Sequence, residues 1–368
     1  MQNKSIVLYT NCINTSEKTR MVTSKRNINN INDLIKTNHE VVQNETAEIE
    51  PSELYIVTEI EGSQQADQKP KKVTIDDKVN LHAVLKAKEN NKSIYFSNAK
   101  NIKINGKKIN PKQIKPWPKT KEIDIEWFKV EPIKESYSYV NSGNRIKYEE
   151  TKFDQGWTTI ADVHPTYLMD QFPEEKTGVG VMRYKVKLAT DNKTLSTPGK
   201  NKNRKGGISD KLVRVSFRPN TGSWVDYVFE LFNTPYIWGS RTKQIDGQVG
   251  SDCADFALYG WRRAGSKLPY TWSYGLKDKK YTKNVATIDG MTDNGHFLNQ
   301  KRKEITYSQV NEGDVILYPR HIAVLYKDNG NKIFDCDDLV LHTLFEEPKI
   351  DTVCEAYGIP EEVLRWKK

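Results

Sequence analysis

The feature that most constrains the fold of this 368-residue chain is a succession of short strand-like segments across residues 52–189. Residues 123–127 alternate strictly between apolar and acidic side chains, and residues 181–186 continue the β-branched and aromatic bias. Asn105-Gly106 lies between two short runs and is typical of a two-residue hairpin turn. Several short strands joined by polar turns predict a β-rich domain over residues 52–189, built as a sandwich or a small barrel.

Three further segments complete the predicted organisation. Residues 1–51 contain few apolar side chains, too few to offset chain entropy, and are predicted to be a disordered tether. Residues 190–207 hold prolines, glycines and several basic residues. This composition favours a solvated, flexible linker over a dedicated polyanion site. Residues 208–368 form the last domain, which we expect to carry the chemistry.

The predicted tether contains a short apolar stretch that ends at Cys12 and is similar to the tail of a bacterial lipoprotein signal. The stretch is too short for a complete signal, and Asn11 stands where a small residue is usual. Two explanations remain open. The similarity is a coincidence, or the start codon is placed too far downstream, in which case Cys12 is a lipid anchor that attaches the chain to a membrane.

Cys253 is the strongest candidate nucleophile in the sequence. Small and polar residues precede it, and the apolar spacing of residues 256–261 predicts the buried side of a helix. Ser251 or Asp252 is suited to cap that helix. The sulfur then lies in the first helical turn, where unpaired N–H groups and the helix dipole favour a thiolate. The alternative is a buried, inert cysteine on an apolar helix.

His321 is the strongest partner for Cys253, because it opens a run of apolar residues that predicts a buried strand. An imidazole there needs a hydrogen-bonding role, and it would serve as a general base. A third group would orient it. If residues 328–330 form a three-residue hairpin loop, Asp335 and Asp337 share the face of His321, whereas a two-residue turn puts Cys336 and Asp338 there. We favour Asp335, with Asp337 as the alternative, because a core-directed carboxylate needs a partner.

Taken together, these motifs resemble the NlpC/P60 cysteine peptidases. The resemblance rests on Thr-Pro-Tyr-Ile-Trp-Gly at 234–239, Asp-Cys at 252–253, Leu-Pro at 268–269, Gly-Asp-Val at 313–315 and the run 321–326, and it covers residues 225–340. It implies an α+β chain with a papain-like C-terminal domain. It also implies a nucleophile, a base and an orienting group at Cys253, His321 and Asp335. The implied activity is hydrolysis of amide bonds in bacterial cell-wall stem peptides, through a thioester.

The resemblance also implies a substrate site around the nucleophile. We expect Tyr236, Trp238, Asp252 and Asp255 to line it, and the N–H of Cys253 to contribute to an oxyanion hole. Asp255 departs from the family, which usually has Ser-Gly after the cysteine. It binds a cationic group of the substrate, or it caps the helix and pairs with a neighbouring arginine. The irregular segment 273–305 is longer than the family's and forms either a lid over the site or an exposed insertion.

Composition and the remaining residues set the other expectations. The net charge of +9 is compatible with an anionic partner, but lysine and asparagine occur throughout, and we expect no nucleic-acid partner. His82 and His164 lack metal-ligand spacing, and neither a metal nor an organic cofactor is expected. Cys336 and Cys354 pair if the compartment is oxidising. The expected location is the bacterial cell envelope outside the cytoplasm, where residues 52–189 act as a wall-binding module, a spacer or a structural domain.

Two other functions stay open. The residues that follow Cys253, and the order Cys, His, Asp, also resemble transglutaminase-like enzymes, which transfer an acyl group to an amine rather than to water. Residues 234–239 and the Gly-Asp-Val motif argue against that interpretation. The second alternative is a non-catalytic envelope or adhesion protein, and the retention of a cysteine, a histidine and an acidic third residue argues against it.

Overall fold

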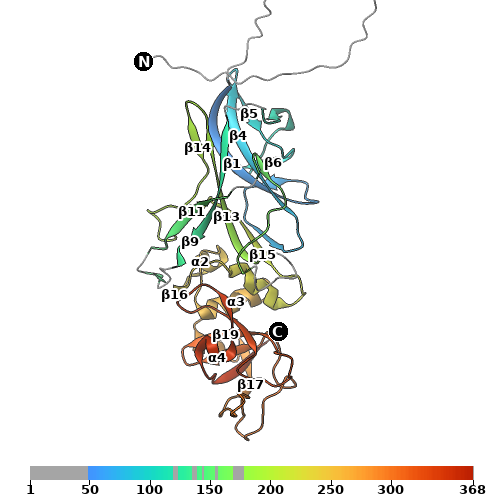
Figure 1. Ribbon diagram of the computed structural model, residues 1–368, viewed down its shortest axis with the longest axis vertical. Helices are drawn as coiled ribbons and strands as arrows, with labels where there is room; N and C mark the ends of the chain where they lie inside the picture. Colours follow the sequence, from blue (N-terminus) through green and yellow to red (C-terminus); the bar gives the residue numbers. More distant parts are fainter. Residues whose placement is uncertain are drawn as a thin grey trace, which may run out of the picture.

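The computed structural model describes residues 49–118, 123–134, 139–142, 145–153, 156–168 and 178–367. Most of the predicted tether, with Cys12, therefore lies outside the described residues. The described part is elongated, with strands β1, β4 and β5 toward one end and β17, β19 and α4 toward the other (Figure 1). None of the described helices is both long enough and apolar enough to span a membrane.

Two sheets make up the end of the molecule that contains β1. The first sheet has the order β7-β6-β2-β1-β4-β5-β8, with β12 paired to β4. Its strands are β1 (Ile49–Ile60), β2 (Ala66–Asp67), β4 (Val79–Glu89), β5 (Lys92–Phe96), β6 (Ile102–Ile104), β7 (Lys107–Lys108), β8 (Ile114–Lys115) and β12 (Thr159–Ile160). A short 3-10 helix, η1 (Pro111–Gln113), precedes β8. The predicted Asn105-Gly106 turn is confirmed, because β6 and β7 pair through Ile104 and Lys107.

The second sheet has the order β11-β9-β13-β15-β3, with β14 paired to β13. Its strands are β3 (Lys71–Thr74), β9 (Asp124–Pro132), β11 (Tyr148–Lys152), β13 (Gly180–Ala189), β14 (Thr194–Ser196) and β15 (Val213–Arg218). Alternating side chains of β1 and β4 share one buried cluster with those of β9, β13 and β15, including Leu85, Trp127 and Tyr184. The two sheets therefore bury a common apolar layer, as the period-2 pattern requires.

A third sheet, with the order β17-β22-β18-β19-β20-β21, lies at the opposite end. Its strands are β17 (Thr282–Thr287), β18 (Val315–Tyr318), β19 (His321–Lys327), β20 (Leu339–His342), β21 (Lys349–Thr352) and β22 (Glu362–Trp366). Helix α3 (Cys253–Arg263) packs on one face, where its Phe256 and Leu258 join Ile322 and Val324 of β19. The other face of the sheet buries Ala323 in a separate cluster.

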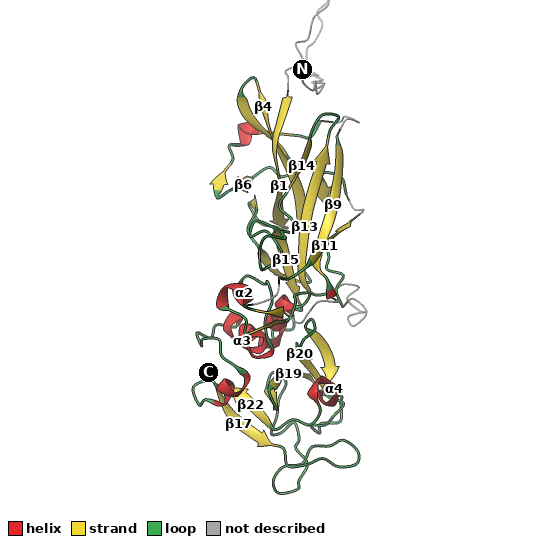
Figure 2. Ribbon diagram, turned by 90° about the vertical axis from the view of Figure 1, so that its left-hand side faces the viewer, coloured by secondary structure: helices red, strands yellow, loops and turns green. Residues whose placement is uncertain are grey.

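Short helical segments connect strands along the chain (Figure 2). These are the 3-10 helices η4 (Trp224–Leu231) and η5 (Ser273–Lys277) and the α-helices α2 (Thr242–Asp246) and α4 (Val353–Tyr357). Strands β10 (Tyr139–Val140) and β16 (Ile237–Trp238) form a separate two-stranded parallel pair, in which β16 directly precedes α2 in the chain.

The predicted fold class is wrong. Strands account for 41% of the described residues and helices for 13%, so the described part of the molecule is mostly β-sheet, with several sheets, and not an α+β chain with a papain-like domain. The physical reason lies in the helical segments, which are short. The pattern at 224–232 predicts a helix, but it folds as the 3-10 helix η4, and Asn233 follows it with a positive φ of 58°. The region beyond residue 273, expected to be irregular up to 305, adds β17 to the sheet.

The predicted domain boundaries also differ from the structure. Residues 190–207 include β14, which pairs with β13 through Leu188 and Leu195, and Thr197 is buried. Strand β15 was assigned to the last domain, yet it pairs with both β13 and β3. It therefore completes the second sheet, and the segment between the two predicted domains is a paired part of that sheet.

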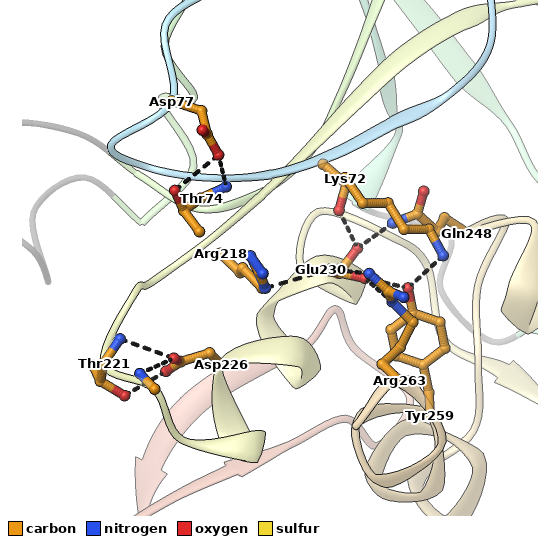
Figure 3. A network of polar contacts seen from close by, with 12 residues as sticks. Lys72, Thr74, Asp77, Arg218, Thr221, Asp226, Glu230, Gln248, Tyr259 and Arg263 are labelled. Atoms are coloured by element: carbon orange, nitrogen blue, oxygen red, sulfur yellow. Dashed lines mark hydrogen bonds and ion pairs between the residues drawn. The ribbon is translucent and has the colours of Figure 1, made fainter. Parts of the chain in front are cut away.

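A buried ionic network joins the second sheet to α3 (Figure 3). Glu230 of η4 is fully buried and accepts hydrogen bonds from Tyr259 (2.7 Å) and from Arg263 (2.7 and 3.0 Å). Arg218 of β15 approaches the same carboxylate at 3.6 Å. Lys72 of β3 donates to the Tyr259 hydroxyl at 2.9 Å. Strands β3 and β15 are thus tied to the helix whose first residue is Cys253.

A disulfide joins Cys336 and Cys354, a pairing that the sequence leaves open because it depends on an oxidising compartment. Cys336 lies in the segment between β19 and β20, and Cys354 lies in α4. The bond therefore holds α4 against that segment, close to β20 and β21.

We expect the double substitution Cys336→Ser/Cys354→Ser to lower the free energy of unfolding by about 3 kcal/mol, because the bond closes a loop of 18 residues in the unfolded chain. Chemical denaturation with and without a reductant measures this difference. The reductant should destabilise the wild type and leave the double variant unchanged. Equal stability of the oxidised wild type and the double variant would contradict the prediction.

Candidate active site

Cys253 begins α3, and Asp252 caps the helix by accepting a hydrogen bond from the N–H of Asp255 at 3.0 Å. The expected position of the sulfur in the first helical turn is confirmed, and of the two candidate caps Asp252 takes the role. The N–H groups of Ile322, Ala254 and Cys253 itself face the sulfur. Because Ile322 follows His321, this contact brings the thiol to the strand that His321 opens.

The electrostatic expectation for the thiol is not met in the unliganded site. Burial, followed by the neighbouring carboxylate of Asp252, raises the pKa of Cys253 to about 12. The surrounding N–H groups lower it, as expected at a helix N-terminus, but they are outweighed. The resting sulfur is therefore a neutral thiol that needs a base.

His321 is fully buried at the start of β19. Its ring packs against those of Tyr318, Tyr357 and His342, with centroids 5.6, 5.4 and 5.2 Å away. Burial, and then the proximity of His342, lowers its pKa to about 3. The imidazole is therefore neutral at physiological pH, which is the state required of a base.

The second ring nitrogen of His321 is held by a short chain of polar groups. His321 Nε2 lies 3.1 Å from His342 Nδ1, and His342 Nε2 lies 3.0 Å from an Asp351 oxygen. Burial alone would raise the pKa of Asp351, but the hydrogen bonds from His342 and Lys349 lower it below its usual value. Asp351 is thus an ionised acceptor, and it fixes the tautomers of both imidazoles.

The tautomers follow from the donors and acceptors. If His342 is neutral and donates from Nε2 to Asp351, its Nδ1 accepts from His321 Nε2. The remaining nitrogen, His321 Nδ1, then carries a lone pair. That atom is buried and has no hydrogen-bond partner in the structure.

Cys253 and His321 are not hydrogen-bonded to each other in the unliganded site. Between these two described residues, the contact runs from the sulfur to the backbone of β19 at Ile322 rather than to the imidazole ring. Catalytic hydrogen bonds are often long or absent before a substrate binds. Cys253 approaches β19 on the face that buries Ile322 and Val324, whereas the His321 ring lies on the opposite face, stacked against Tyr318. The structure therefore brings the thiol to the strand that holds His321, and proton transfer between the two requires the imidazole to turn toward the α3 face.

The expected orienting role of Asp335 is not what the structure shows. Strand β19 pairs with β20 through Val324 and Leu341, so the connection between them is far longer than a three-residue loop. Asp335 lies in that connection, where its carboxylate accepts hydrogen bonds from the amides of Asn329 and Asn331. The alternatives Asp337 and Asp338 lie there as well.

His342 and Asp351 were missed by the sequence reasoning. A signal was present, because residues 339–342 form an apolar run that ends in histidine and mirrors the strand opened by His321. The register places His342 opposite Ala323, on the same face of the sheet as His321. The connection between β19 and β20 is long, so the sequence pattern alone did not indicate that these two strands pair.

Two of the expected substrate-lining residues flank the nucleophile. Tyr236 is buried, and burial, together with the charges of Cys253 and Asp252, raises its pKa far above the usual value. Its ring contacts that of Phe345, with centroids 5.3 Å apart. Trp238 is 64% exposed and precedes Gly239, whose N–H faces the Asp252 carboxylate. Phe345, itself 60% exposed, is a further aromatic neighbour that the sequence did not single out.

Asp252, which is half-buried, and Asp255, which is buried, form a pair of carboxyl groups at the start of α3. The Ser240 hydroxyl donates to Asp255 at 2.7 Å, and the second Asp255 oxygen is buried without a partner. Neither Arg262 nor Arg263 pairs with Asp255, because they bind Leu268 and Glu230 instead. Burial, and then the charge of Asp252, raises the pKa of Asp255 to about 8.

This shift predicts that the protein loses stability as the pH rises from about 4 to about 8. The folded state keeps Asp255 protonated up to about pH 8, whereas the unfolded chain releases the proton near its ordinary value of 3.8. Unfolding therefore releases a proton in this interval, and rising pH favours the unfolded state. Denaturation midpoints measured across the interval should decline less steeply for Asp255→Asn than for the wild type. Asp293→Asn, at an exposed position, is the control and should follow the wild type.

The Gly-Asp-Val motif has a structural role. Asp314 binds Arg365 of β22 through two contacts, at 2.8 and 2.7 Å. Gly313 has a φ of +88°, and a Cβ there would lie 2.6 Å from the Trp224 indole nitrogen. Neither a side chain nor the ordinary backbone conformation fits at this position.

The other histidines that the structure describes have ordinary partners. His82 contacts Glu59 and Thr159, and His296, in the segment considered as a lid, contacts Glu304. Across the described ranges, no group of three or more histidine, cysteine, aspartate or glutamate side chains is placed to hold a metal ion.

Comparison with known proteins gave no assignment: no family model, curated protein or solved structure matches the chain.

Proposed function

We propose that the chain is a cysteine hydrolase that cleaves amide bonds, with Cys253 as nucleophile and His321 as base. The observation that carries the proposal is the unpartnered Nδ1 of His321, whose other nitrogen is held by His342 and Asp351. A buried imidazole fixed in this way, in a strand that is contacted by a cysteine at a helix N-terminus, has the donors and acceptors that nucleophilic catalysis requires once its ring turns toward the sulfur.

The proposed reaction starts from the neutral pair. Nδ1 of His321 takes the thiol proton while the sulfur of Cys253 attacks the amide carbonyl carbon. The N–H groups around the sulfur, including that of Ile322, stabilise the charge that develops on the carbonyl oxygen. Collapse transfers the proton to the leaving amine and forms a thioester. Water, deprotonated by the same nitrogen, then attacks the thioester, releases the acid and regenerates the thiol.

The proposed substrates are peptide stems of bacterial cell-wall peptidoglycan. The resemblance of residues 234–239, 252–253 and 321–326 to NlpC/P60 peptidases supports this class. The proposed place of action is the cell envelope outside the cytoplasm. The disulfide between Cys336 and Cys354 supports an oxidising compartment, because such bonds are rare where thiols are kept reduced.

The test is mass spectrometry of peptidoglycan fragments after digestion with the wild-type chain and with Cys253→Ala. We expect new stem-peptide products with the wild type only. An amine acceptor included in a parallel reaction separates hydrolysis from acyl transfer, since transfer adds the mass of the amine. Adducts in place of free acids would support the transglutaminase-like alternative, and no products with any wall type would count against an enzyme.

A further inference from the structure

The positive charge of the chain is concentrated in one segment. Residues 86–118 contain nine lysines, no arginine and a single acidic residue, Glu89, which gives a net charge of +8. The whole chain carries +9. Although lysine occurs throughout the sequence, the rest of the chain taken together carries a net charge of only +1, because +9 less +8 leaves +1.

The fold places these lysines at the two edges of the first sheet, near β6 and β7 at one edge and near β5, β8 and the end of β4 at the other. The two edges share one apolar cluster, in which Ile102 of β6 packs with Tyr95 of β5 and Ile114 of β8. Two of them are paired, Lys86 with Glu53 and Lys115 with Glu89. Within the described residues, six exposed lysines of this segment have no ion-pair partner: Lys88, Lys92, Lys100, Lys107, Lys108 and Lys112. Strands β5 and β6 lie far from α3 and β19 along the molecule, so this basic region is separate from the candidate active site (Figure 1).

A polar cleft of about 510 Å³ opens within the basic region. Lys100 and Lys108 line it, together with Glu59, Gln64, Asn98 and Asn101. In the part of the chain that the structure describes, the side-chain amides of Gln64 and Asn101 are exposed and make no hydrogen bond. Each amide offers both donors and an acceptor, which suits hydroxyl groups.

We propose that this region binds an anionic polymer built from hydroxylated units, such as a polyol phosphate or an acidic polysaccharide. The unpaired lysines supply attraction to regularly spaced anionic groups, and the amides of the cleft bind the hydroxyls. Binding of this polymer by the basic region does not depend on the proposed hydrolysis.

Nucleic acid and an anionic lipid bilayer fit this basic region less well. Residues 86–118 lack the arginines that bind bases and phosphates in bidentate fashion. The large side chains most exposed in the described structure, such as Trp157, Trp238 and Trp272, all lie outside this segment. It therefore offers neither stacking platforms for unpaired bases nor apolar groups to enter a lipid bilayer.

The experiment measures binding of the full chain to soluble poly(glycerol phosphate), polygalacturonate, neutral dextran and duplex DNA at several salt concentrations. We expect binding to at least one of the two anionic hydroxylated polymers, stronger than to DNA or dextran. The relative affinities of the first two distinguish the phosphate and carboxylate sources. Tighter binding to DNA than to both, or no binding to either, would overturn the proposal.

Two sets of variants locate the site. Replacing Lys100, Lys107, Lys108 and Lys112 with glutamine should weaken binding at least about tenfold at low salt and reduce the salt slope by about one unit per contacting lysine. Replacing Lys243, Lys267, Lys279 and Lys301 removes the same charge from exposed positions elsewhere and should leave affinity unchanged. Gln64→Ala/Asn101→Ala should weaken binding with an unchanged salt slope. Equal losses in the two lysine sets would show that only net charge matters and would contradict a site.

Discussion

His321→Ala is expected to lower kcat/KM for cleavage of a responsive stem peptide by about 10³-fold, the usual scale for loss of a general base. Burial holds the pKa of Cys253 near 12, so almost no thiolate exists at neutral pH without a base. The loss should appear mainly in kcat, because the imidazole of His321 transfers a proton and is not proposed to bind the substrate. His164→Ala removes an exposed histidine of the β-rich region and serves as the control.

Two further measurements separate a catalytic role from a structural one. Alkylation of Cys253 by iodoacetamide, followed by peptide mass spectrometry, should slow in His321→Ala even without a substrate. Asp351→Asn should reduce kcat by about 10- to 100-fold, the scale for an outer partner that fixes a histidine tautomer. If His321→Ala keeps wild-type kcat and alkylation rate while remaining folded, the assignment of the base is wrong.

Glu230→Gln is expected to lower the free energy of unfolding by about 3–5 kcal/mol, the range for breaking a buried ion pair. The glutamine keeps the shape of the side chain but removes the charge that Arg263 and Arg218 share. Arg263 then loses its buried partner at the end of α3, and the Tyr259 hydroxyl faces an amide instead of a carboxylate. The destabilisation follows from uncompensated charge rather than from lost volume.

The matched control is Glu61→Gln, which breaks the exposed pair between Glu61 and Lys78 at 3.5 Å. Exposed pairs contribute about 0–1 kcal/mol, so this variant should unfold close to the wild type. Urea denaturation followed by fluorescence and by circular dichroism measures both variants. Equal midpoints for Glu230→Gln and Glu61→Gln would remove the buried network from the account of stability.

The buried ionic network around Glu230 also bears on where the chain divides into domains. The sequence suggests a flexible linker at 190–207, because prolines, glycines and basic residues usually mark solvated boundaries. In the fold, β14 lies within this segment and β15 follows it, both as paired strands of one sheet, and Arg218 of β15 reaches Glu230. Composition describes exposure well, but it carries no information about which distant strand supplies a hydrogen-bonding partner.

Local features of the fold and of the candidate site were set by the sequence. The alternation of residues 123–127 and the Asn105-Gly106 turn depend on contacts within one or two strands. The cap at Asp252 and the start of the helix at Cys253 depend on neighbours a few residues apart. Such features follow from backbone geometry and side-chain chemistry that the sequence states directly.

The orienting group and the fold class were decided by the tertiary structure. Asp335 was favoured because a short hairpin would bring it to the face of His321, but the strand that pairs with β19 begins at Leu339, and His342 takes that place. The choice among registers depends on how the whole sheet buries its apolar faces, and that sheet joins strands from β17, which begins at Thr282, to β22, which ends at Trp366. The high pKa of Cys253 has the same origin, because burial by distant elements outweighs the local effect of the helix N-terminus.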